Sequence, residues 1–329
     1  MIGCYVNLSG MTEPALPLPA DVQAAAKRVA PYIEVTPVLR SAVLDALAGA
    51  SLLFKAEHLQ RGGAFKLRGA TNAVMALGQA QAAAGVVTHS SGNHGAALAL
   101  AASAREIACH VVVPEGALAS KLANIASYGA VIWRCAPTQS ARETVTAQIQ
   151  QQTGAHLVHP YADAHVIAGQ GTATLELIDQ CGAPDVMVVP VGGGGLAAGT
   201  RLALALAAPH CELVLAEPGG AAETYQSLQH GQRTVDFVPD TVCDGLRGAL
   251  GAPNFALLNG HARVITVGDD ATVAAMRLLW QHLKQTVEPS SAITLAAILS
   301  APERFAGRRV GVMLTGGNVD LDALPWSRP

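Results

Sequence analysis

Short apolar runs alternate with longer amphipathic stretches along most of the chain. In the longer stretches, such as 138–153 and 271–286, apolar residues recur every three to four positions, which is the helical period. Residues 186–189 (VMVV) are continuously apolar, as is typical of strands buried on both faces. This alternation predicts an α/β fold with open, mostly parallel, twisted sheets and helices on both faces. The strand candidates are 52–56, 85–88, 110–113, 131–134, 156–159, 186–191, 213–216, 264–267 and 310–314.

The length of 329 residues allows about two domains, at roughly 150 residues each. The sequence contains no low-complexity linker or charge block that would separate two halves. We therefore expect two sheets, with a small domain inserted in a large one and joined to it by two crossings of the chain. The expected large domain takes residues 1–80 and 164–329, and the expected small domain takes residues 81–163.

The composition excludes several classes of protein. Hydrophobic residues make up 50% of the chain and charged residues 14%, whereas disorder requires low hydrophobicity and high charge. The net charge of −3 argues against nucleic-acid binding, which needs a clustered basic surface. The longest uncharged stretch, 81–104, has His, Ser and Asn residues at its centre, so we expect no membrane span.

The start of the chain and the cysteines indicate the compartment. The first residues, MIGCYVNLSGMTEPALPLP, lack the basic and apolar regions of a secretory signal. The cysteines are scattered and form no C-x-x-C pair, so we expect neither a disulfide framework nor a zinc site, and a reducing, cytoplasmic location. They are Cys4, Cys109, Cys135, Cys181, Cys211 and Cys243.

Four consecutive glycines, Gly192 to Gly195, lie between an apolar strand candidate and a helical stretch. Such a loop can turn successive N–H groups toward one anion, and the following helix N-terminus adds a positive dipole, so the loop predicts a phosphate site. A flexible connection is the plain alternative. A sharper one is a dinucleotide site of a nicotinamide-dependent dehydrogenase, because residues 193–198 fit G-x-G-x-x-A and Glu217 follows about 20 residues later.

The segment GGAFKLRGA, residues 62–70, places Lys66 after a small-residue turn and at the start of a helical stretch. A lysine becomes nucleophilic when burial or nearby positive charge lowers its pKa, and we expect Arg68 to supply part of that charge. The alternative is an ordinary solvated lysine, which the positive end of the helix dipole disfavours.

Two further loops carry polar side chains. The hydroxyls, amide and helix N-terminus of THSSGNHG, residues 88–95, suit a carboxylate. The alternative there is a helix start capped by Ser91 or Asn93. TGGN, residues 315–318, follows a strand candidate, and its alternative is a plain turn.

Together these segments resemble the fold-type II pyridoxal phosphate enzymes, which have the tryptophan synthase beta-like fold, and in particular their serine/threonine dehydratase and serine racemase branch. The resemblance runs from about residue 20 to residue 320. It implies that the large domain binds the cofactor and the small domain gates the substrate. The segments that carry it, in the order of the family, are GGAFKLRGA, THSSGNHGAA, HPYADAHVIAGQGT, VPVGGGGLAAG, AEPGGAAETY, CDGLRGALG, VEPSSA and LTGGNVD.

The resemblance implies a role for each matching residue. Lys66 is joined to pyridoxal phosphate, with Phe65 against its ring, Asn93 at its phenolic oxygen and Thr315 at its pyridine nitrogen. The phosphate lies among Gly192, Gly193, Gly194 and Gly195. The substrate carboxylate lies among Ser90, Ser91, Asn93 and His94, and Arg142 matches an arginine near the substrate in the racemases. Glu217, the Ala221 carbonyl and Glu223 match a site for Mg²⁺, Mn²⁺ or Ca²⁺, the alternative being two solvated acids.

The activity implied by the resemblance is that of an ammonia-lyase, a dehydratase that converts a β-hydroxy amino acid to a 2-oxo acid and ammonia. Lys66 removes the α-proton, while Ser91 could return one from the opposite face, so a racemase is the nearest alternative and an amino-acid-binding protein a distant one. Gly248 and Ala64 replace serines of the branch, which leaves room for substrates larger than serine or threonine, such as phenylserine. The resemblance also implies a homodimer.

Overall fold

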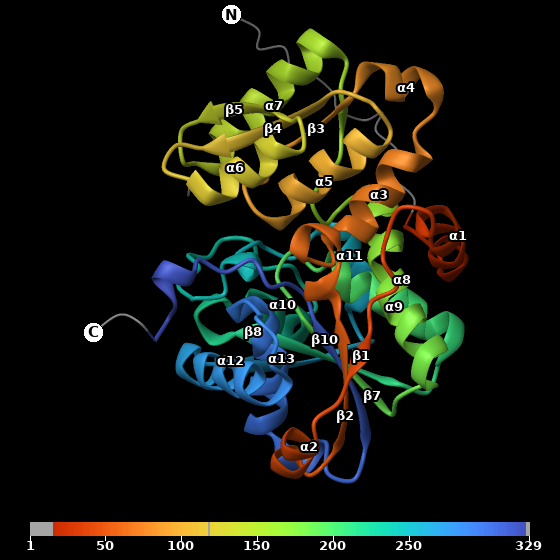
Figure 1. Ribbon diagram of the computed structural model, residues 1–329, viewed down its shortest axis with the longest axis vertical. Coiled ribbons are helices and arrows are strands. Elements are labelled where there is room, and N and C mark those ends of the chain that lie inside the picture. Colours follow the sequence, from red (N-terminus) through yellow and green to blue (C-terminus); the bar gives the residue numbers. More distant parts are fainter. Residues whose placement is uncertain (1–15, 118, 327–329) are drawn as a thin grey trace, which may run out of the picture.

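The computed structural model describes residues 16–326 except residue 118, and it consists of two stacked lobes (Figure 1). The helices are α1 (Pro19–Val29), α2 (Ala42–Ala48), α3 (Lys66–Ala76), α4 (Gln79–Ala84), α5 (Asn93–Ala104), α6 (Ala119–Ser127), α7 (Gln139–Thr153), α8 (Ala164–Cys181), α9 (Gly195–Ala207), α10 (Glu223–His230), α11 (Ala252–Leu258), α12 (Asp269–Leu283) and α13 (Pro289–Ser300). The strands are β1 (Val38–Leu39), β2 (Ser51–Ala56), β3 (Val86–Thr88), β4 (Cys109–Pro114), β5 (Val131–Cys135), β6 (His156–Leu157), β7 (Val186–Pro190), β8 (Glu212–Pro218), β9 (Arg263–Val267) and β10 (Arg309–Leu314). The nine strands expected from the sequence are all present, and β1 is an addition.

The lower lobe is built on a six-stranded sheet with the order β1-β2-β10-β7-β8-β9. Its strands are parallel except β1, which pairs antiparallel with β2. Strand β10 lies between β2 and β7, and Val312 is in register with Phe54 on one side and Val188 on the other. Segments from both ends of the chain therefore form one sheet, as the predicted insertion requires.

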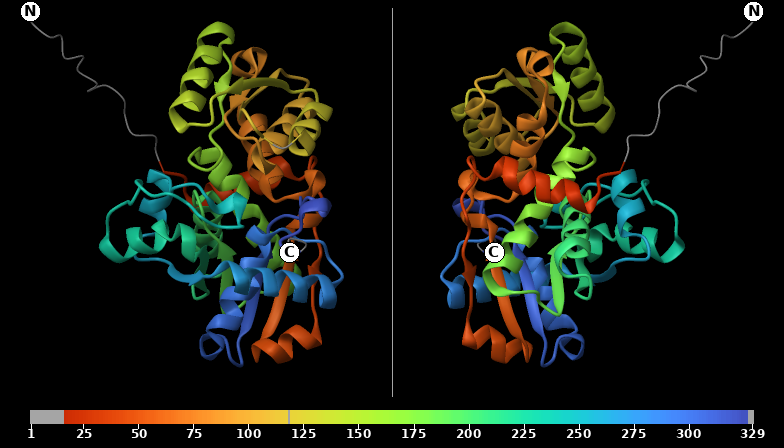
Figure 2. Two further views of the ribbon diagram at one scale, coloured as in Figure 1. Left: turned by 90° about the vertical axis from the view of Figure 1, so that its left-hand side faces the viewer. Right: turned by 90° about the vertical axis from the view of Figure 1, so that its right-hand side faces the viewer.

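The upper lobe is built on a parallel four-stranded sheet with the order β5-β4-β3-β6. All four strands lie between residues 86 and 157, so this sheet is inserted within the larger unit. Seen from the sides in Figure 2, the lobes stack along the long axis, and the segment with α10 and α11 projects to one side of the lower lobe. The exact domain boundaries at residues 80 and 163 remain predictions.

Small residues allow the helices behind the sheets to pack closely. A Cβ added to Gly69 on α3 would lie 2.3 Å from the Gln170 side chain on α8, and one added to Gly169 would lie 2.7 Å from the Arg68 carbonyl. On the other side of α8, a Cβ at Gly199 of α9 would lie 2.3 Å from the Ile167 carbonyl. The glycine-rich composition thus brings α3, α8 and α9 together beneath the candidate site.

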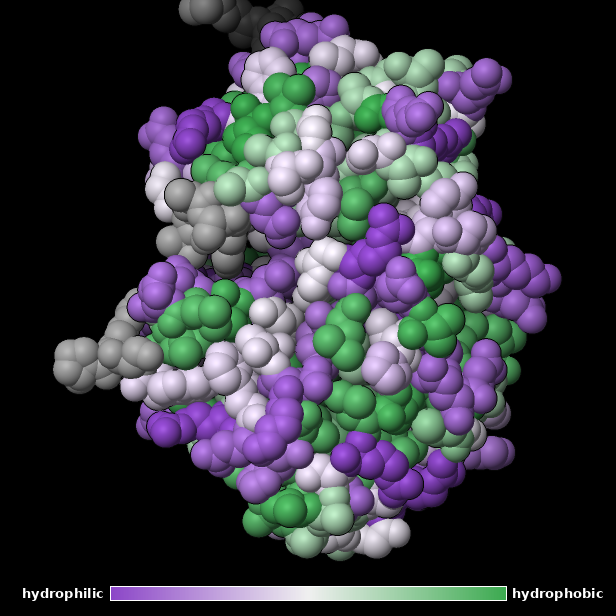
Figure 3. All heavy atoms as spheres, viewed as in Figure 1, coloured by the Kyte–Doolittle hydropathy of each residue, from purple (hydrophilic) through white to green (hydrophobic). Residues whose placement is uncertain are grey.

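The surface of the described residues is mixed in hydropathy, and their cysteines are unpaired. On the face shown in Figure 3, hydrophobic residues lie in separate patches among hydrophilic ones. Among the described helices, none is long and apolar enough to cross a membrane. The five cysteines in the described part of the chain are free thiols. Cys4 and most of the N-terminal segment in which we expected no secretory signal lie outside the described residues.

Candidate active site

The four predicted loops converge where the chain passes between the two lobes. Loop 62–65 and loop 315–318 are joined by a bridge between Ala64 and Gly316 and by the Phe65 N–H, which donates to the Thr315 carbonyl (2.9 Å). The Asn318 amide donates to the Gly62 carbonyl (3.0 Å) and to Asn93 Oδ1 (2.9 Å). Loops that follow β2, β3 and β10 thus meet at the carboxyl ends of their strands, where α/β proteins bind ligands.

Lys66 is the first residue of α3, and its amine is buried in this site. The Nζ atom donates to the Pro160 carbonyl (3.1 Å) and lies 5.0 Å from the centre of the Phe65 ring. Burial lowers the pKa of Lys66 to about 8, and only the negative charge of Glu288 acts against it. A large fraction of this amine is therefore neutral near pH 8, as a nucleophile or base requires.

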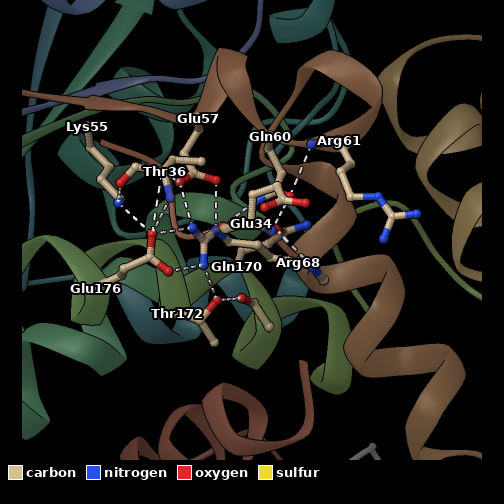
Figure 4. Close-up of polar contacts among 12 residues, drawn as sticks. Glu34, Thr36, Lys55, Glu57, Gln60, Arg61, Arg68, Gln170, Thr172 and Glu176 are labelled. Atoms are coloured by element: carbon tan, nitrogen blue, oxygen red, sulfur yellow. Dashed lines mark hydrogen bonds and ion pairs between the residues drawn. The ribbon is translucent and has the colours of Figure 1, made fainter. Parts of the chain in front are cut away.

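Arg68 does not act on Lys66 as the sequence led us to expect. Two residues along a helix are separated by roughly 200° of rotation, so Arg68 points to the other side of α3. It forms a two-pronged ion pair with Glu57 (2.7 and 2.8 Å) and hydrogen bonds to both carboxylate oxygens of Glu176 (2.8 and 3.1 Å), as Figure 4 shows. The expectation is wrong because these two carboxylates neutralise the guanidinium.

The cluster around Arg68 also contains a buried lysine, Lys55. Lys55 Nζ donates to Glu176 Oε1 (2.6 Å), to the Thr36 carbonyl (2.6 Å) and to Gln180 Oε1 (3.1 Å). Burial alone would raise the pKa of Glu176, but hydrogen bonds from Arg68 and Lys55, together with their positive charges, lower it. This ionic network ties β2, α3 and α8 together and so fixes the helix that carries Lys66 (Figure 4).

The glycine loop has no space for side chains. A Cβ would come within 2.8 Å of Leu246 at Gly192, 2.4 Å of the Tyr161 ring at Gly193 and 2.4 Å of Leu250 at Gly194. Gly194 also has φ of 86°, and the loop leads directly into the N-terminus of α9. Small size and a positive helix end fit a phosphate, as predicted. The loop is not a flexible connection, since its neighbours enclose it.

Asn254 connects this loop with the segment beside Lys66. Its buried amide donates to the Gly193 carbonyl (2.5 Å) and to the Tyr161 carbonyl (2.8 Å). Tyr161 follows Pro160, which accepts the Lys66 hydrogen bond. The glycine loop and the amine are thus parts of one site.

Asn93 is held from two sides by residues to which the sequence analysis assigned no role. Its amide donates to Glu288 (3.0 and 3.3 Å), and its oxygen accepts from Asn318. Both partners lie in the segments VEPSSA and LTGGNVD, so the signal for a site was present. Their contact with Asn93 was not predictable, because they lie 195 and 225 residues away along the chain.

Ser90 and Ser91 lie in loop 88–92, just before the start of α5, and both are half-buried. The N-cap of α5 is Gly92, with no side-chain cap, so the alternative of a helix start capped by Ser91 or Asn93 is wrong. A Cβ on Gly95 would lie 2.1 Å from the Ser90 carbonyl, so a glycine is needed for the loop to fold against the helix.

The side chain of His94 is buried within the upper lobe. Its Nε2 lies 3.3 Å from the Val158 carbonyl. Burial, and then the positive charge of Lys66, lower the pKa of His94 well below its usual value. His94 is therefore neutral and offers no positive charge to a carboxylate.

Arg142 on α7 is half-buried, and its Nε atom is buried with no hydrogen-bond partner among the described residues. Burial lowers the pKa of His89 in loop 88–92, while the charge of Glu143 raises it and that of Arg142 lowers it, so both charged residues of α7 lie near this ring. The His89 ring packs edge-on against His159 (5.3 Å), which packs in turn against Tyr161 (4.6 Å). Arg142 therefore has an unused donor and lies near the loop that holds the serines.

Thr315 directly follows β10 and is buried, with its hydroxyl 3.5 Å from the Ser290 carbonyl. Its own carbonyl holds the Phe65 N–H. The loop is thus a fixed part of the site rather than a plain turn.

The predicted metal ligands lie at the end of β8. Glu217 and Glu223 are buried, so the alternative of two solvated acids is wrong. Burial, and for Glu223 also repulsion by Glu217, raise the pKa of Glu217 to about 7 and that of Glu223 to about 8. Glu223 Oε2 has no hydrogen-bond partner in the described part of the chain. Ala221, two residues before Glu223, is also buried. The oxygen donors fit a hard divalent cation, although the described residues contain no group of three or more His, Cys, Asp or Glu side chains that could hold a metal ion.

Glu217 also decides against the dinucleotide alternative. Its two carboxylate oxygens accept the backbone N–H groups of Thr224 (2.7 Å) and Tyr225 (2.8 Å) at the start of α10. The carboxylate therefore holds the start of α10 and does not serve a ribose, while each of its oxygens keeps a second lone pair that suits a cation.

Comparisons with known proteins agree with this geometry. The family model "Pyridoxal-phosphate dependent enzyme" matches residues 29–316. A beta-hydroxyaspartate dehydratase of Paracoccus denitrificans (strain Pd 1222) is 48% identical over 313 residues, which are 95% of this chain and 99% of the relative. The structure of serine racemase from Dictyostelium discoideum has a TM-score of 0.90 at 44% identity and covers 93% of this chain and 100% of that chain. The structure of a pyridoxal 5'-phosphate-dependent aspartate racemase has a TM-score of 0.89 at 35% identity and covers 95% of this chain and 100% of that chain.

Proposed function

Because this chain belongs to the family of pyridoxal-phosphate-dependent enzymes, we propose that it is a lyase that converts a β-hydroxy amino acid with a second carboxylate to a 2-oxo acid and ammonia. The observation that carries the lyase chemistry is the buried amine of Lys66, whose pKa is lowered to about 8. Gly192 to Gly195, Asn93 and Thr315 are proposed to hold the cofactor, since hydrogen bonds tie their three loops to the segments beside this amine.

Pyridoxal phosphate supplies an electron sink that makes the α-proton of an amino acid removable. The neutral Lys66 amine takes that proton, and the Pro160 carbonyl orients the amine through its hydrogen bond. Thr315 would offer a hydroxyl, not a carboxylate, to the pyridine nitrogen, so the electron sink would stay weak and prompt loss of the β-hydroxyl would be favoured. The released enamine adds water and gives the 2-oxo acid and ammonia.

The second carboxylate of the substrate is proposed to pair with Arg142. This arginine has an unpartnered buried Nε and lies close enough to His89 to lower its pKa. An anionic side chain satisfies such a donor, whereas the hydroxymethyl group of serine does not reach as far. The names of two relatives, a beta-hydroxyaspartate dehydratase and an aspartate racemase, support an acidic substrate.

A substrate panel tests this proposal. The holoenzyme is given the stereoisomers of β-hydroxyaspartate, serine, threonine and phenylserine, and ammonia and 2-oxo acid are measured. We expect the highest kcat/KM for β-hydroxyaspartate. In Arg142→Met this value should fall about tenfold to a hundredfold, as for a lost hydrogen bond to a charged group, with little change for serine. Arg134→Met, an exposed arginine on β5, is the matched control.

The outcomes separate the parts of the proposal. Ammonia from serine but not from β-hydroxyaspartate contradicts the acidic substrate, and an equal loss for both substrates in Arg142→Met contradicts the role of Arg142. Release of ammonia from none of them contradicts the lyase. Racemisation is the second candidate activity, favoured by the 44% identity to a serine racemase, and chiral analysis of the remaining substrate detects it.

A divalent cation at Glu217, the Ala221 carbonyl and Glu223 is part of the same proposal. A cation would satisfy the unpartnered oxygen of Glu223 and remove the repulsion between two buried carboxylates. We expect millimolar Mg²⁺ to raise the Tm of the EDTA-treated protein. At 100 times Kd the free energy of unfolding should increase by about 2.7 kcal/mol. Glu223→Gln should abolish this effect, and an unchanged effect would contradict the site.

The gating role of residues 81–163 and a homodimer are proposed on the resemblance alone. Light scattering of the purified protein tests the dimer, and a monomer mass would contradict it.

A further inference from the structure

Tyr161 lies against the glycine loop, although the sequence analysis gave it no role. A Cβ on Gly193 would fall 2.4 Å from the Tyr161 ring, and one on Gly195 would fall 3.0 Å from its backbone. The ring therefore covers the loop at the point where the chain returns from the upper lobe. Its edge-on contact with His159 and the hydrogen bond from Asn254 to its carbonyl hold it there.

The hydroxyl end of Tyr161 borders the space left by Gly248. A Cβ on Gly248 would lie 3.6 Å from Tyr161 Cε1, 3.8 Å from the Tyr161 hydroxyl and 3.7 Å from the Gly193 nitrogen. The hydroxyl and the backbone N–H of Gly193 thus flank the same small space. The room that we expected for a larger substrate is partly bounded by this phenol.

The hydroxyl is suited to donate a hydrogen bond. The hydrogen bonds that the structure records for Tyr161 are made by its backbone, which donates to His159 Nδ1 (3.4 Å) and accepts from Asn254 (2.8 Å). Burial raises the pKa of Tyr161, so the phenol keeps its proton at neutral pH. A donor beside a backbone N–H is an arrangement that favours an anion.

We propose that the Tyr161 hydroxyl donates a hydrogen bond to the phosphate of pyridoxal phosphate, across the space that Gly248 leaves beside the glycine loop. Tyr161 thereby supplies a hydroxyl where residue 248 has no side chain. This inference concerns the cofactor and does not depend on which amino acid is the substrate.

The test compares cofactors with and without a phosphate. The apoprotein of wild type and of Tyr161→Phe is titrated with pyridoxal phosphate and with pyridoxal, and binding is followed by visible absorbance. We expect Tyr161→Phe to bind pyridoxal phosphate about tenfold more weakly or worse, since it loses a hydrogen bond to a charged group, and to bind pyridoxal as the wild type does. Tyr128→Phe, a half-buried tyrosine of the upper lobe, should match the wild type for both.

Two further measurements sharpen the result. Inorganic phosphate should raise the Tm of the wild-type apoprotein more than that of Tyr161→Phe. The double variant Tyr161→Phe/Gly248→Ser should regain part of the affinity for pyridoxal phosphate, because a serine hydroxyl enters the same space. Wild-type affinity in Tyr161→Phe, an equal loss for pyridoxal phosphate and pyridoxal, or no recovery in the double variant would overturn the proposal. An inactive wild-type enzyme with this binding pattern would overturn only the proposed function.

Discussion

Lys55, buried on β2, and Lys66, half-buried at the start of α3, have opposite surroundings. The ammonium of Lys55 has three acceptors, which are Glu176, the Thr36 carbonyl and Gln180. For the Lys66 amine, the one hydrogen bond recorded in the described part of the chain goes to the Pro160 carbonyl. Lys55 serves as a structural cation, while Lys66 is available for chemistry.

The electrostatics explain the difference. Burial lowers the pKa of both lysines, but at Lys55 a hydrogen bond and an ion pair with Glu176 act against burial at contact distance. At Lys66 only the charge of Glu288 opposes burial, and the pKa falls to about 8. Burial lowers the pKa of a lysine enough to make it reactive only where few hydrogen-bond acceptors and little opposite charge lie near its ammonium group.

The largest expected effect is the loss of Lys66. Lys66→Ala should lower turnover by at least about 10³-fold, because both the bond to the cofactor and the general base are removed. Borohydride reduction of the wild-type holoenzyme followed by peptide mass analysis should place the cofactor on Lys66 and leave Lys55 unmodified. Cofactor found on Lys55, or full activity in Lys66→Ala, would break the comparison.

Glu176→Gln should make Lys55 resemble Lys66. The substitution removes the carboxylate that pairs with both Lys55 and Arg68, and breaking such a buried pair costs about 3–5 kcal/mol of unfolding free energy. Urea unfolding measures this loss. Arg263→Gln, which breaks an exposed pair with Glu212, should cost less than about 1 kcal/mol. Equal effects of the two substitutions would show that the buried network carries no special stability.

The pH dependence of cofactor capture should report Lys66 alone. Only a neutral amine can react, and its fraction rises as pH increases through the pKa. We expect the rate at which the apoprotein takes up pyridoxal phosphate to rise with a midpoint near pH 8, not near the ordinary lysine value of 10.5. Stopped-flow absorbance gives the midpoint. A midpoint near 10.5 would mean that the site does not depress the pKa.

The smallest effect is expected from Glu288→Gln. The charge of Glu288 raises the pKa of Lys66, so its removal should move the midpoint of cofactor capture below pH 8. Glu303→Gln, an exposed acid of the lower lobe, should leave the midpoint unchanged. A shift to higher pH in Glu288→Gln would contradict the assigned electrostatics.

Much of the fold could be predicted from the sequence because buried parallel strands are continuous apolar runs. The predicted run 310–314 became β10 in the middle of the larger sheet. Strand β1 was missed because its two residues, Val38 and Leu39, are too few to show a period. The glycine loop and Lys66 could also be predicted, because each is identified by residues that are adjacent in the sequence.

Contacts across the chain could not be predicted. Arg68 was assigned to Lys66 because the two are neighbours in sequence, whereas its partner Glu176 is 108 residues away. Glu288, Asn318 and Tyr161 lay in the segments that revealed the family, but spacing alone does not show which side chains meet. Those meetings are decided by the register of the sheets and the packing of helices.

Pro160 connects the reactive amine with a segment far from it in the sequence. This residue lies on the connection by which the chain leaves the upper lobe, yet its carbonyl holds an amine mounted on α3. The position of the reactive amine is therefore set by two segments that lie 94 residues apart, α3, which carries the amine, and the connection at Pro160, which accepts its hydrogen bond.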